Sequence, residues 1–444
     1  MKKLILLFLL GLLCNSLYSQ QSLSFTLSRE QAVADVDSLV STITTVHPDP
    51  FTVITRTDFM SDIEDVKASL PDSIKGLDLF LRLAPLVAAI GDGHTNINAT
   101  MLHYTQLEGP RFLPLELFVD PITFVMTSGG KEVLEINGIG ADQIVEAVLA
   151  MESGESRAFR AISVRDWNTR VSVLYPAEEY TVLLRQGEGM ETLQLDGITY
   201  DRISAIVPER KRKPFYDYRI MEDRNTAVLE FNSFNDGEKF AVFLDSMFTD
   251  INNRGIDNLI IDIRNNGGGN SILGDELFQY ISPVPFTQFG KMTLRVSEPI
   301  RGKAMKEGAS AEEWELMKRD TILVFDSDDS DLHALRENPL RFTAPDKNIY
   351  LLTSVASFSS ATDFAWAFRY FKMGTIVGAE TGGYIVCFGD TIPFYLRNSH
   401  IPGNVSWKEF YGYGATDAER HPVYPNIEVR AGEALDYVLD NLIK

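Results

Sequence analysis

The sequence contains little cysteine and little positive charge, and both shortages restrict what the protein can do. Only Cys14 and Cys387 are cysteines among the 444 residues. Cys14 lies in the leader described below, so the mature chain keeps one cysteine and forms no intrachain disulfide. We interpret Cys387 as a small buried apolar residue, because no base stands near it in the sequence to activate its thiol. Lysine and arginine number 41 against 62 acidic residues, a net charge of −21, so we expect no nucleic-acid partner.

Long apolar runs are also missing. The run Leu4–Leu13 follows Lys2 and Lys3 and is too short to cross a hydrocarbon layer of ~30 Å as a helix. Together with the polar stretch that ends at Ser19, it predicts a cleaved signal peptide at residues 1–19. We therefore expect a periplasmic or secreted protein without stable membrane insertion. A lipid anchor on Cys14 is disfavoured, because Leu13 stands where lipoprotein signals have a small residue.

What is present indicates a globular protein of several domains. Apolar residues make up 45% of the chain and charged residues 23%, as in ordinary folded proteins, and the length predicts two or three domains. Periodic apolar residues after a capping box at Ser28 and Gln31 predict a helical N-terminal domain at 20–108. Alternating short runs predict a β-rich module at 109–205.

The remaining residues, 206–444, show strands alternating with helices, which predicts an α/β domain with right-handed crossovers. We expect strands at Thr226–Phe234, Asn258–Ile263 and Asn348–Thr353, with the stretch between residue 282 and Asn348 irregular. The acidic run Asp326–Asp331 lacks the glycine and final glutamate of a calcium loop, and is interpreted as a solvated loop.

The first segment that suits catalysis is the turn at residues 91–95, Gly-Asp-Gly-His-Thr, directly after an apolar helix. Glycines allow a sharp turn that leaves the imidazole of His94 accessible, and a pKa near ~6.5 suits proton transfer at neutral pH. The alternative for His94 is a structural hydrogen bond to a loop carbonyl.

The second segment, residues 262–270, reads Asp-Ile-Arg-Asn-Asn-Gly-Gly-Gly-Asn and follows a buried strand. Consecutive glycine N–H groups between a strand and a helix can stabilise an oxyanion or bind phosphate. Phosphate binding is disfavoured, because there is no Walker lysine and no Gly-x-Gly-x-x-Gly spacing. A purely structural turn is the other alternative.

The third segment, residues 357–363, reads Ser-Phe-Ser-Ser-Ala-Thr-Asp and opens an apolar helix. A serine at a helix N-terminus is exposed to the positive end of the helix dipole, which favours the charge that develops during nucleophilic attack. Ser360 with Asp363 also fits a helix-capping box, which is the alternative.

Taken together, the three segments resemble the superfamily of tricorn-like and C-terminal-processing (tail-specific) serine proteases. Further matching features are His47-Pro48 in the helical start and the sequence Val-Gly-x-Glu-Thr-x-Gly at 377–383. The resemblance implies a Clp-protease/crotonase-like α/β catalytic domain, with a helical N-terminal segment and a small β-rich, PDZ-like insert. It implies a peptide or protein substrate and neither a metal nor an organic cofactor.

The resemblance also assigns roles to residues. Ser360 is the expected nucleophile, with Ser359 as the near alternative, and His94 is the expected base. The tail-specific branch uses a serine and a lysine, but no lysine occurs between Lys372 and Lys408, so the tricorn-like Ser/His/Glu branch is implied.

In that branch a late glutamate orients the site, which corresponds to Glu419, unless Glu419 is only a surface carboxylate. Backbone N–H groups of Gly268, Gly267 and Ala361 would form the oxyanion hole. His421 is an alternative base outside the motif. Gly93 departs from the pattern, which has a polar residue just before the histidine.

Three functions remain open at this point. The leading hypothesis is an exported serine peptidase that acts through an acyl-enzyme. A catalytically weak relative that binds a peptide or an apolar ligand is the alternative. A lipase-like hydrolase is disfavoured by the lack of a Gly-x-Ser-x-Gly motif.

Overall fold

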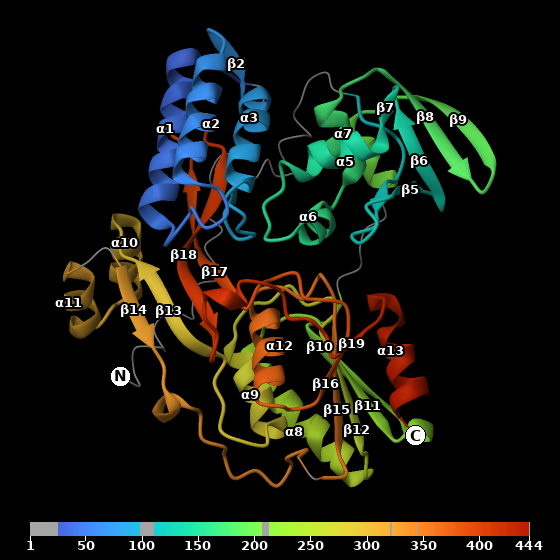
Figure 1. The fold of residues 1–444 in the computed structure, drawn as a ribbon, viewed down its shortest axis with the longest axis vertical. Helices are drawn as coiled ribbons and strands as arrows, with labels where there is room; N and C mark the ends of the chain where they lie inside the picture. Colours follow the sequence, from blue (N-terminus) through green and yellow to red (C-terminus); the bar gives the residue numbers. More distant parts are fainter. Residues whose placement is uncertain (1–24, 98–110, 207–212, 320–321, 344, 444) are drawn as a thin grey trace.

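The computed structural model describes residues 25–97, 111–206, 213–319, 322–343 and 345–443. The leader at 1–19, with Cys14, lies outside these residues. Within the part of the chain that is described, no helix has the length and apolar character needed to cross a membrane. Figure 1 shows helical and β-rich parts above a larger α/β part.

The N-terminal part is helical, as predicted. The capping box is confirmed, because Ser28 Oγ accepts from the N–H of Gln31 while Gln31 Oε1 accepts from the N–H of Ser28. The last helix is buried on most sides, contains Pro85 and ends at Ala88. The elements are β1 (Thr26–Ser28), α1 (Arg29–Val46), α2 (Arg56–Ser69), β2 (Ser73–Lys75), α3 (Gly76–Ala88) and β3 (Asn96–Ile97).

The next part is a β-rich module with its own apolar core. Its sheet has the order β4-β5-β6-β8-β9, and β7 pairs with β6. The strands are β4 (Phe118–Val119), β5 (Met126–Ser128), β6 (Lys131–Ile136), β7 (Ile139–Gly140), β8 (Glu179–Gln186) and β9 (Gly189–Asp196). Three helices, α5 (Ala141–Leu149), α6 (Arg157–Ser163) and α7 (Trp167–Leu174), and the 3₁₀ turn Tyr200–Ala205 complete the module.

The α/β part is built on a mixed sheet of order β10-β11-β12-β15-β16-β19, in which only the β10–β11 pair is antiparallel. The strands are β10 (Tyr216–Met221), β11 (Thr226–Phe231), β12 (Asn258–Asp262), β15 (Asn348–Thr353), β16 (Thr375–Gly378) and β19 (Ile427–Glu428). The helices are α8 (Gly237–Asn253), α9 (Ile272–Ile281), α12 (Ser360–Tyr370) and α13 (Ala434–Tyr437), which the π-helical turn Val438–Leu442 continues.

Alternation along the central strands covers both faces of this sheet. In β12, Leu259 and Ile261 pack into the core formed with α8, α9 and α12, whereas Ile260 faces the smaller cluster that contains Val438. Because successive side chains of a strand point to opposite faces, an uninterrupted apolar strand is buried on both sides. The predicted α/β alternation is therefore confirmed.

The prediction of an irregular stretch after residue 282 was wrong. Residues there form β13 (Phe289–Arg295), α10 (Glu298–Glu307), α11 (Ala311–Arg319) and β14 (Ile322–Asp326). These strands join a second sheet of order β14-β13-β18-β17, with β17 (Val386–Tyr395) and β18 (Pro402–Gly412). The acidic run ends in a 3₁₀ turn capped by Asp328.

Two features of this architecture bring distant segments together. The adjacent parallel strands β12 and β15 end at the same edge of the main sheet, which places residues 262–270 beside residues 354–360. Strand β3 pairs with β18, so the turn after α3 is held against the second sheet. The carboxyl edge of a parallel sheet is the usual place for ligand binding.

Candidate active site

Ser359 is the serine that faces His94. His94 Nε2 lies 3.1 Å from Ser359 Oγ, although 265 positions separate the two residues. Ser359 is the N-cap of α12, but its hydroxyl makes no capping hydrogen bond. Its backbone has φ 55° and ψ −130°, a conformation that costs of order 1–3 kcal/mol for a residue with a side chain and that clusters at functional sites.

Ser360, the expected nucleophile, has another partner. Its Oγ donates to the carbonyl oxygen of Gly269 at 2.7 Å, which fixes the start of α12 to the glycine-rich segment. The alternative of a Ser360–Asp363 capping box is wrong, because α12 begins at Ser360 itself and the Asp363 N–H donates to the Ser359 carbonyl. The hydroxyl in reach of the imidazole is therefore one residue earlier than predicted.

Asp92 is the acid that holds the His94 turn. Its Oδ1 accepts from the His94 backbone N–H at 2.9 Å and lies 3.6 Å from His94 Nδ1. Its Oδ2 accepts from Ser406 Oγ at 2.6 Å and contacts His47 Nε2 at 3.2 Å. Because the Asp49 N–H donates to His47 Nδ1, we assign the proton of His47 to Nε2, which then donates to Asp92.

The pKa values follow from this burial and pairing. Burial of the Asp92 carboxylate acts to raise its pKa, but hydrogen bonds from His47 and His94, together with the charge of His94, outweigh burial and hold the pKa well below its usual value. For His94, burial favours the neutral imidazole, yet Asp92, with smaller contributions from Glu155 and Asp390, raises the pKa above 6.5. The Nδ1 side of His94 therefore faces negative charge, while Nε2 faces Ser359.

Two further buried carboxyl groups lie near His94. Burial, followed by the charge of Asp92, raises the pKa of Glu155 to about 7. Burial likewise raises the pKa of Asp363, in the first turn of α12, to about 7, although the nearby His94 opposes this shift. Sequence reasoning missed Glu155, which comes from the β-rich module and belongs to no motif.

The expected oxyanion donors are only partly free. The N–H of Gly268 donates to Asn266 Oδ1 at 2.9 Å, and that of Ala361 donates to the Phe358 carbonyl at 3.2 Å. Gly268 approaches the nucleophile closely: a Cβ there would come within 2.8 Å of Ser359 Cβ and 3.0 Å of Ser360 N. A Cβ on Gly267 would meet no atom within 4 Å, so this glycine borders open space. Within the described residues, the N–H groups of Gly267 and Ser360 donate no hydrogen bond.

Other predicted residues lie in structural positions. Glu419 accepts from the N–H and Oγ of Thr416 and caps a 3₁₀ turn, whereas Asp92 and Glu155 are among the acids that lie beside His94. His421 Nδ1 lies 2.7 Å from the Pro422 carbonyl oxygen. Cys387 is buried, and burial raises its thiol pKa well above the usual value, as expected for an inert apolar residue.

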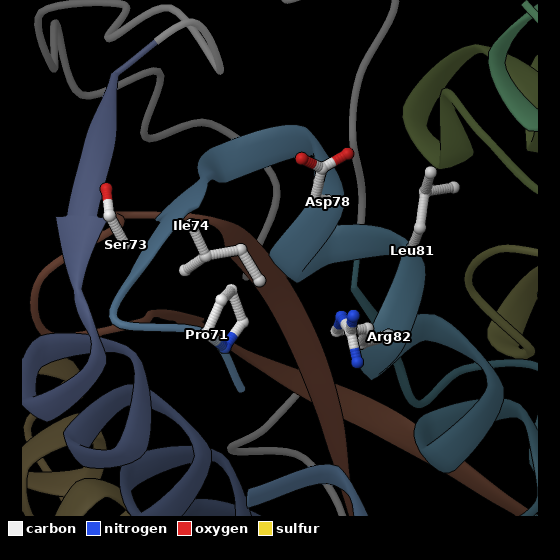
Figure 2. A pocket seen from close by; sticks show the side chains of 6 residues that line it. All are labelled: Pro71, Ser73, Ile74, Asp78, Leu81 and Arg82. Atoms are coloured by element: carbon white, nitrogen blue, oxygen red, sulfur yellow. The ribbon is translucent and has the colours of Figure 1, made fainter. Parts of the chain in front are cut away.

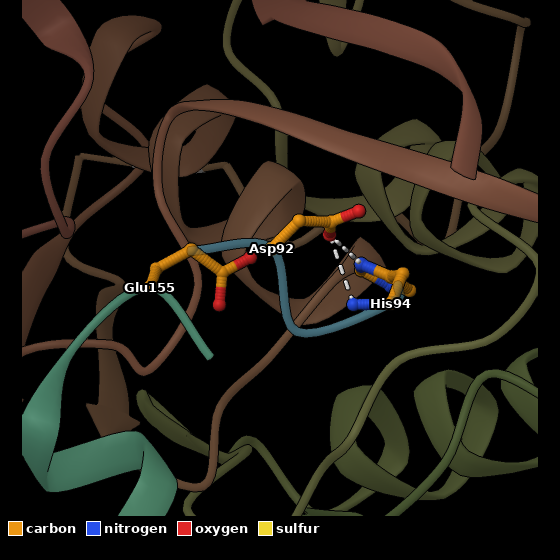
Figure 3. Close-up of side chains that lie close together, drawn as sticks. All are labelled: Asp92, His94 and Glu155. Carbon is orange, nitrogen blue, oxygen red and sulfur yellow. Dashed lines mark hydrogen bonds and ion pairs between the residues drawn. The ribbon is translucent and has the colours of Figure 1, made fainter. Parts of the chain in front are cut away.

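The Asp92, His94 and Glu155 ligand atoms all lie within 4.8 Å of one another (Figure 3). Such a group can bind a cation in principle. We interpret it as a proton-transfer cluster, because the Asp92 oxygens already accept three hydrogen bonds and His94 Nε2 faces a serine hydroxyl.

A separate hollow lies on the N-terminal part, beside β2 and the first half of α3 (Figure 2). Its lining comprises Pro71, Ser73, Ile74, Asp78, Leu81 and Arg82. Because α3 rises 1.5 Å per residue, Asp78 and Ala88 are about 15 Å apart along it, and the hollow takes no part in the site.

Comparison with known proteins identifies the α/β part. Residues 225–427 match the model of peptidase family S41. The chain carries a peptidase family S41 domain. The predicted resemblance to tail-specific and C-terminal-processing proteases is thereby confirmed, and the domain is that of a serine peptidase, a hydrolase. The matched span includes both Ser359 and the glycine-rich segment, whereas His94 lies before it.

Solved structures support the S41 fold. Mature CPAF is similar with a TM-score of 0.60 at 14% identity, covering 94% of this chain and 97% of that chain. Mature CPAF complexed with lactacystin gives a TM-score of 0.59 at 14% identity, covering 94% and 98%. Together with the family match, they confirm the predicted α/β, Clp-protease-like fold class. A comparison with curated proteins finds no match.

Proposed function

We propose that this S41 chain is an exported peptidase in which Ser359 is the nucleophile, His94 the general base and Asp92 the acid that orients the imidazole. The observation that carries the proposal is the distance of 3.1 Å between His94 Nε2 and Ser359 Oγ. It lies within the reach needed for proton transfer. The strained backbone of Ser359, and the lack of a capping hydrogen bond to its hydroxyl, support the same assignment.

The reaction follows from these positions. Ser359 Oγ attacks the scissile carbonyl carbon while His94 Nε2 accepts the hydroxyl proton. Collapse of the tetrahedral intermediate breaks the C–N bond, and His94 gives the proton to the leaving amine. A water molecule, deprotonated by His94, then hydrolyses the acyl-enzyme and regenerates Ser359.

Backbone N–H groups would stabilise the oxyanion. We assign this role to Ser360 N–H, which directly follows the nucleophile at the N-terminus of α12, and to Gly267 N–H, which borders open space. Donors placed in this way act without reorganisation during the reaction, and losing one typically costs ~10²-fold or more. The helix dipole of α12 favours the same developing negative charge.

Asp92 takes the role that sequence reasoning gave to Glu419. Its separation of 3.6 Å from His94 Nδ1 is slightly longer than a hydrogen bond, as is common in unliganded sites, where such contacts tighten when substrate binds. The ionised carboxylate favours the tautomer with the proton on Nδ1, and this leaves Nε2 free to accept the serine proton.

The proposal is tested with purified mature protein and a panel of fluorogenic peptides. Ser359→Ala and His94→Ala should each lower kcat/KM by at least about 10³-fold. Ser360→Ala is the matched control: it removes one hydrogen bond, worth about 1 kcal/mol of stability, keeps the backbone N–H, and should keep measurable activity. Loss of activity in Ser360→Ala but not in Ser359→Ala would contradict the assignment.

Export rests on the signal at residues 1–19. N-terminal sequencing of protein recovered from outside the cytoplasm should begin at Gln20, and recovery of cytoplasmic protein that begins at Met1 would contradict it.

A further inference from the structure

The β-rich module sends one carboxylate into the proposed active site. Glu155 lies between α5 and α6, and Figure 3 shows it on a different segment from Asp92 and His94. Both Glu155 carboxylate oxygens are buried and accept no hydrogen bond, and His94 Nδ1 is also buried without a hydrogen-bond partner. The N–H groups of Gly93 and Glu155 lie close enough to lower the Glu155 pKa, but neither makes a hydrogen bond of normal geometry. A buried carboxyl group without a hydrogen-bond partner lowers the stability of the fold, so its presence points to a functional role.

Gly93 provides the space for this carboxylate. A Cβ on Gly93 would come within 2.9 Å of Glu155 Oε2 and 2.8 Å of Phe358 Cζ, closer than Cβ atoms approach other atoms. A side chain immediately before His94 would therefore force the Glu155 carboxylate and the Phe358 ring to shift. The polar group beside the imidazole comes from the module instead of from the turn.

Contacts on several sides fix the segment that carries Glu155. Tyr384 Oη donates to the Glu155 carbonyl at 3.0 Å. Arg160 donates through Nε to the Gly154 carbonyl at 3.0 Å and through Nη2 to the Ala88 carbonyl, at the end of α3, at 2.9 Å. The ring of Phe159 stacks on that of Phe358 with centroids 4.0 Å apart, and Phe358 stacks in turn on His94. The segment is thus held by the same residues that surround the nucleophile.

We propose that Glu155 is a positioning residue for His94, acting with Asp92 to stabilise the imidazolium that forms when His94 accepts the Ser359 proton. This inference rests on the proposed function. It makes the β-rich module part of the active site, because the site loses one of the acids beside His94 when the segment at Glu155 moves away.

The charged surroundings define the expected pH behaviour. Asp92 and His94 face Glu155 from the turn, and Arg160 faces it from α6. Tyr384 faces it from the segment that leads into β17, and Cys387 from β17 itself. Asp390 and Asp363 act on His94 from other sides, and Asp390 is paired with Lys408 Nζ at 2.6 Å. Neutralising Glu155 removes one of the negative charges that favour imidazolium, so the His94 pKa should fall.

The test compares Glu155→Gln with Glu152→Gln. Glu152 is a matched control, because it is a buried acid of the same module that pairs with Arg170 at 2.8 Å. We expect Glu155→Gln to lower kcat by about 10- to 100-fold, part of the ~10²–10⁴-fold that general-base catalysis supplies, with KM changed less than about twofold. The acid limb of the pH profile should move to lower pH. Glu152→Gln should keep the wild-type profile.

A measurement that does not depend on activity distinguishes a role of Glu155 from a loss of activity caused by misfolding. In the Ser359→Ala background, the His94 imidazole is titrated by NMR with and without Glu155→Gln, and we expect a lower His94 pKa when Glu155 is neutralised. Glu155→Ala should also be rescued partly by added formate, which can restore a carboxylate to the vacated space.

The outcomes separate the two proposals. If the wild type is active and Ser359→Ala is not, but Glu155→Gln matches Glu152→Gln in kcat and pH profile, the role of Glu155 is refuted and the proposed function stands. If wild type and Ser359→Ala hydrolyse peptides equally, the proposed function fails and the role of Glu155 fails with it.

Discussion

Replacing Asp92 by asparagine tests the assignment of the acid most sharply, because the two residues have the same shape. Asp92 is fully buried and accepts from one donor at Oδ1 and from two at Oδ2. An asparagine offers one oxygen and one amide group. If its oxygen serves Ser406 and His47, its NH₂ group points at His94, donates to Nδ1 and places the imidazole proton on Nε2. That tautomer cannot accept the Ser359 proton.

The magnitude follows from these contacts. The wrong tautomer should lower kcat by about 10²–10⁴-fold, as expected for loss of an orienting carboxylate in a serine triad. The displaced hydrogen bond and the new contact between two donors should cost about 1–3 kcal/mol of stability. Peptide hydrolysis and urea unfolding of the same preparations measure the two effects. Asp92→Asn with wild-type kcat would refute the assignment of Asp92, whatever its stability.

The remaining predictions concern pH and packing. Activity should rise with pH through an apparent pKa above 6.5, because the base must be neutral and its pKa is raised; a kcat/KM profile with its acid limb at or below 6 would contradict this. The free energy of unfolding should fall as pH rises over the same range. The raised pKa of His94 contributes stability that is complete below about 6.5 and is lost above the pKa of His94 in the folded protein. Glu155, whose pKa is raised to about 7, acts with the same sign. Unfolding free energies that increase from pH 5 to 8 would oppose this. Gly268→Ala, at φ 95° and with a Cβ 2.8 Å from Ser359 Cβ, should displace the nucleophile and lower kcat about 10²-fold, and near-normal turnover would contradict the packing at the nucleophile. Native Cys387 should resist alkylation until urea unfolds the protein, and rapid labelling of the folded protein would be inconsistent with its burial.

The three segments that meet at the proposed site were recognisable in the sequence because each lies at one end of a helix or strand. His94 follows the apolar helix α3, and the glycine-rich segment follows β12, where the sharp change from apolar run to glycines marks the strand end. The core strands were recognisable because they are buried on both faces and read as continuous apolar runs. Strands β13 and β14, with partly exposed side chains, gave no such signal.

The differences between the predicted site and the proposed one have equally local causes. Ser359 and Ser360 are consecutive residues at the start of an apolar helix, so composition cannot tell which hydroxyl faces the imidazole. In the structure Ser359 Oγ lies 3.1 Å from His94 Nε2, whereas Ser360 Oγ donates to the Gly269 carbonyl. The role proposed for Asp92 was not predicted, because Asp92 stands inside the histidine motif and is typical of a turn residue. Glu155 comes from another part of the chain and follows no periodic pattern, so only the folded arrangement brings it to His94.

The position of a covalent adduct identifies the nucleophile directly. Mature protein is treated with a fluorophosphonate, digested and analysed by mass spectrometry, and the modified residue is located by fragmentation. We expect one phosphonylated serine, Ser359, with no adduct in Ser359→Ala and a persistent adduct in Ser360→Ala. An adduct on Ser360, or one that survives in Ser359→Ala, would refute the assignment of Ser359 as the hydroxyl activated by His94.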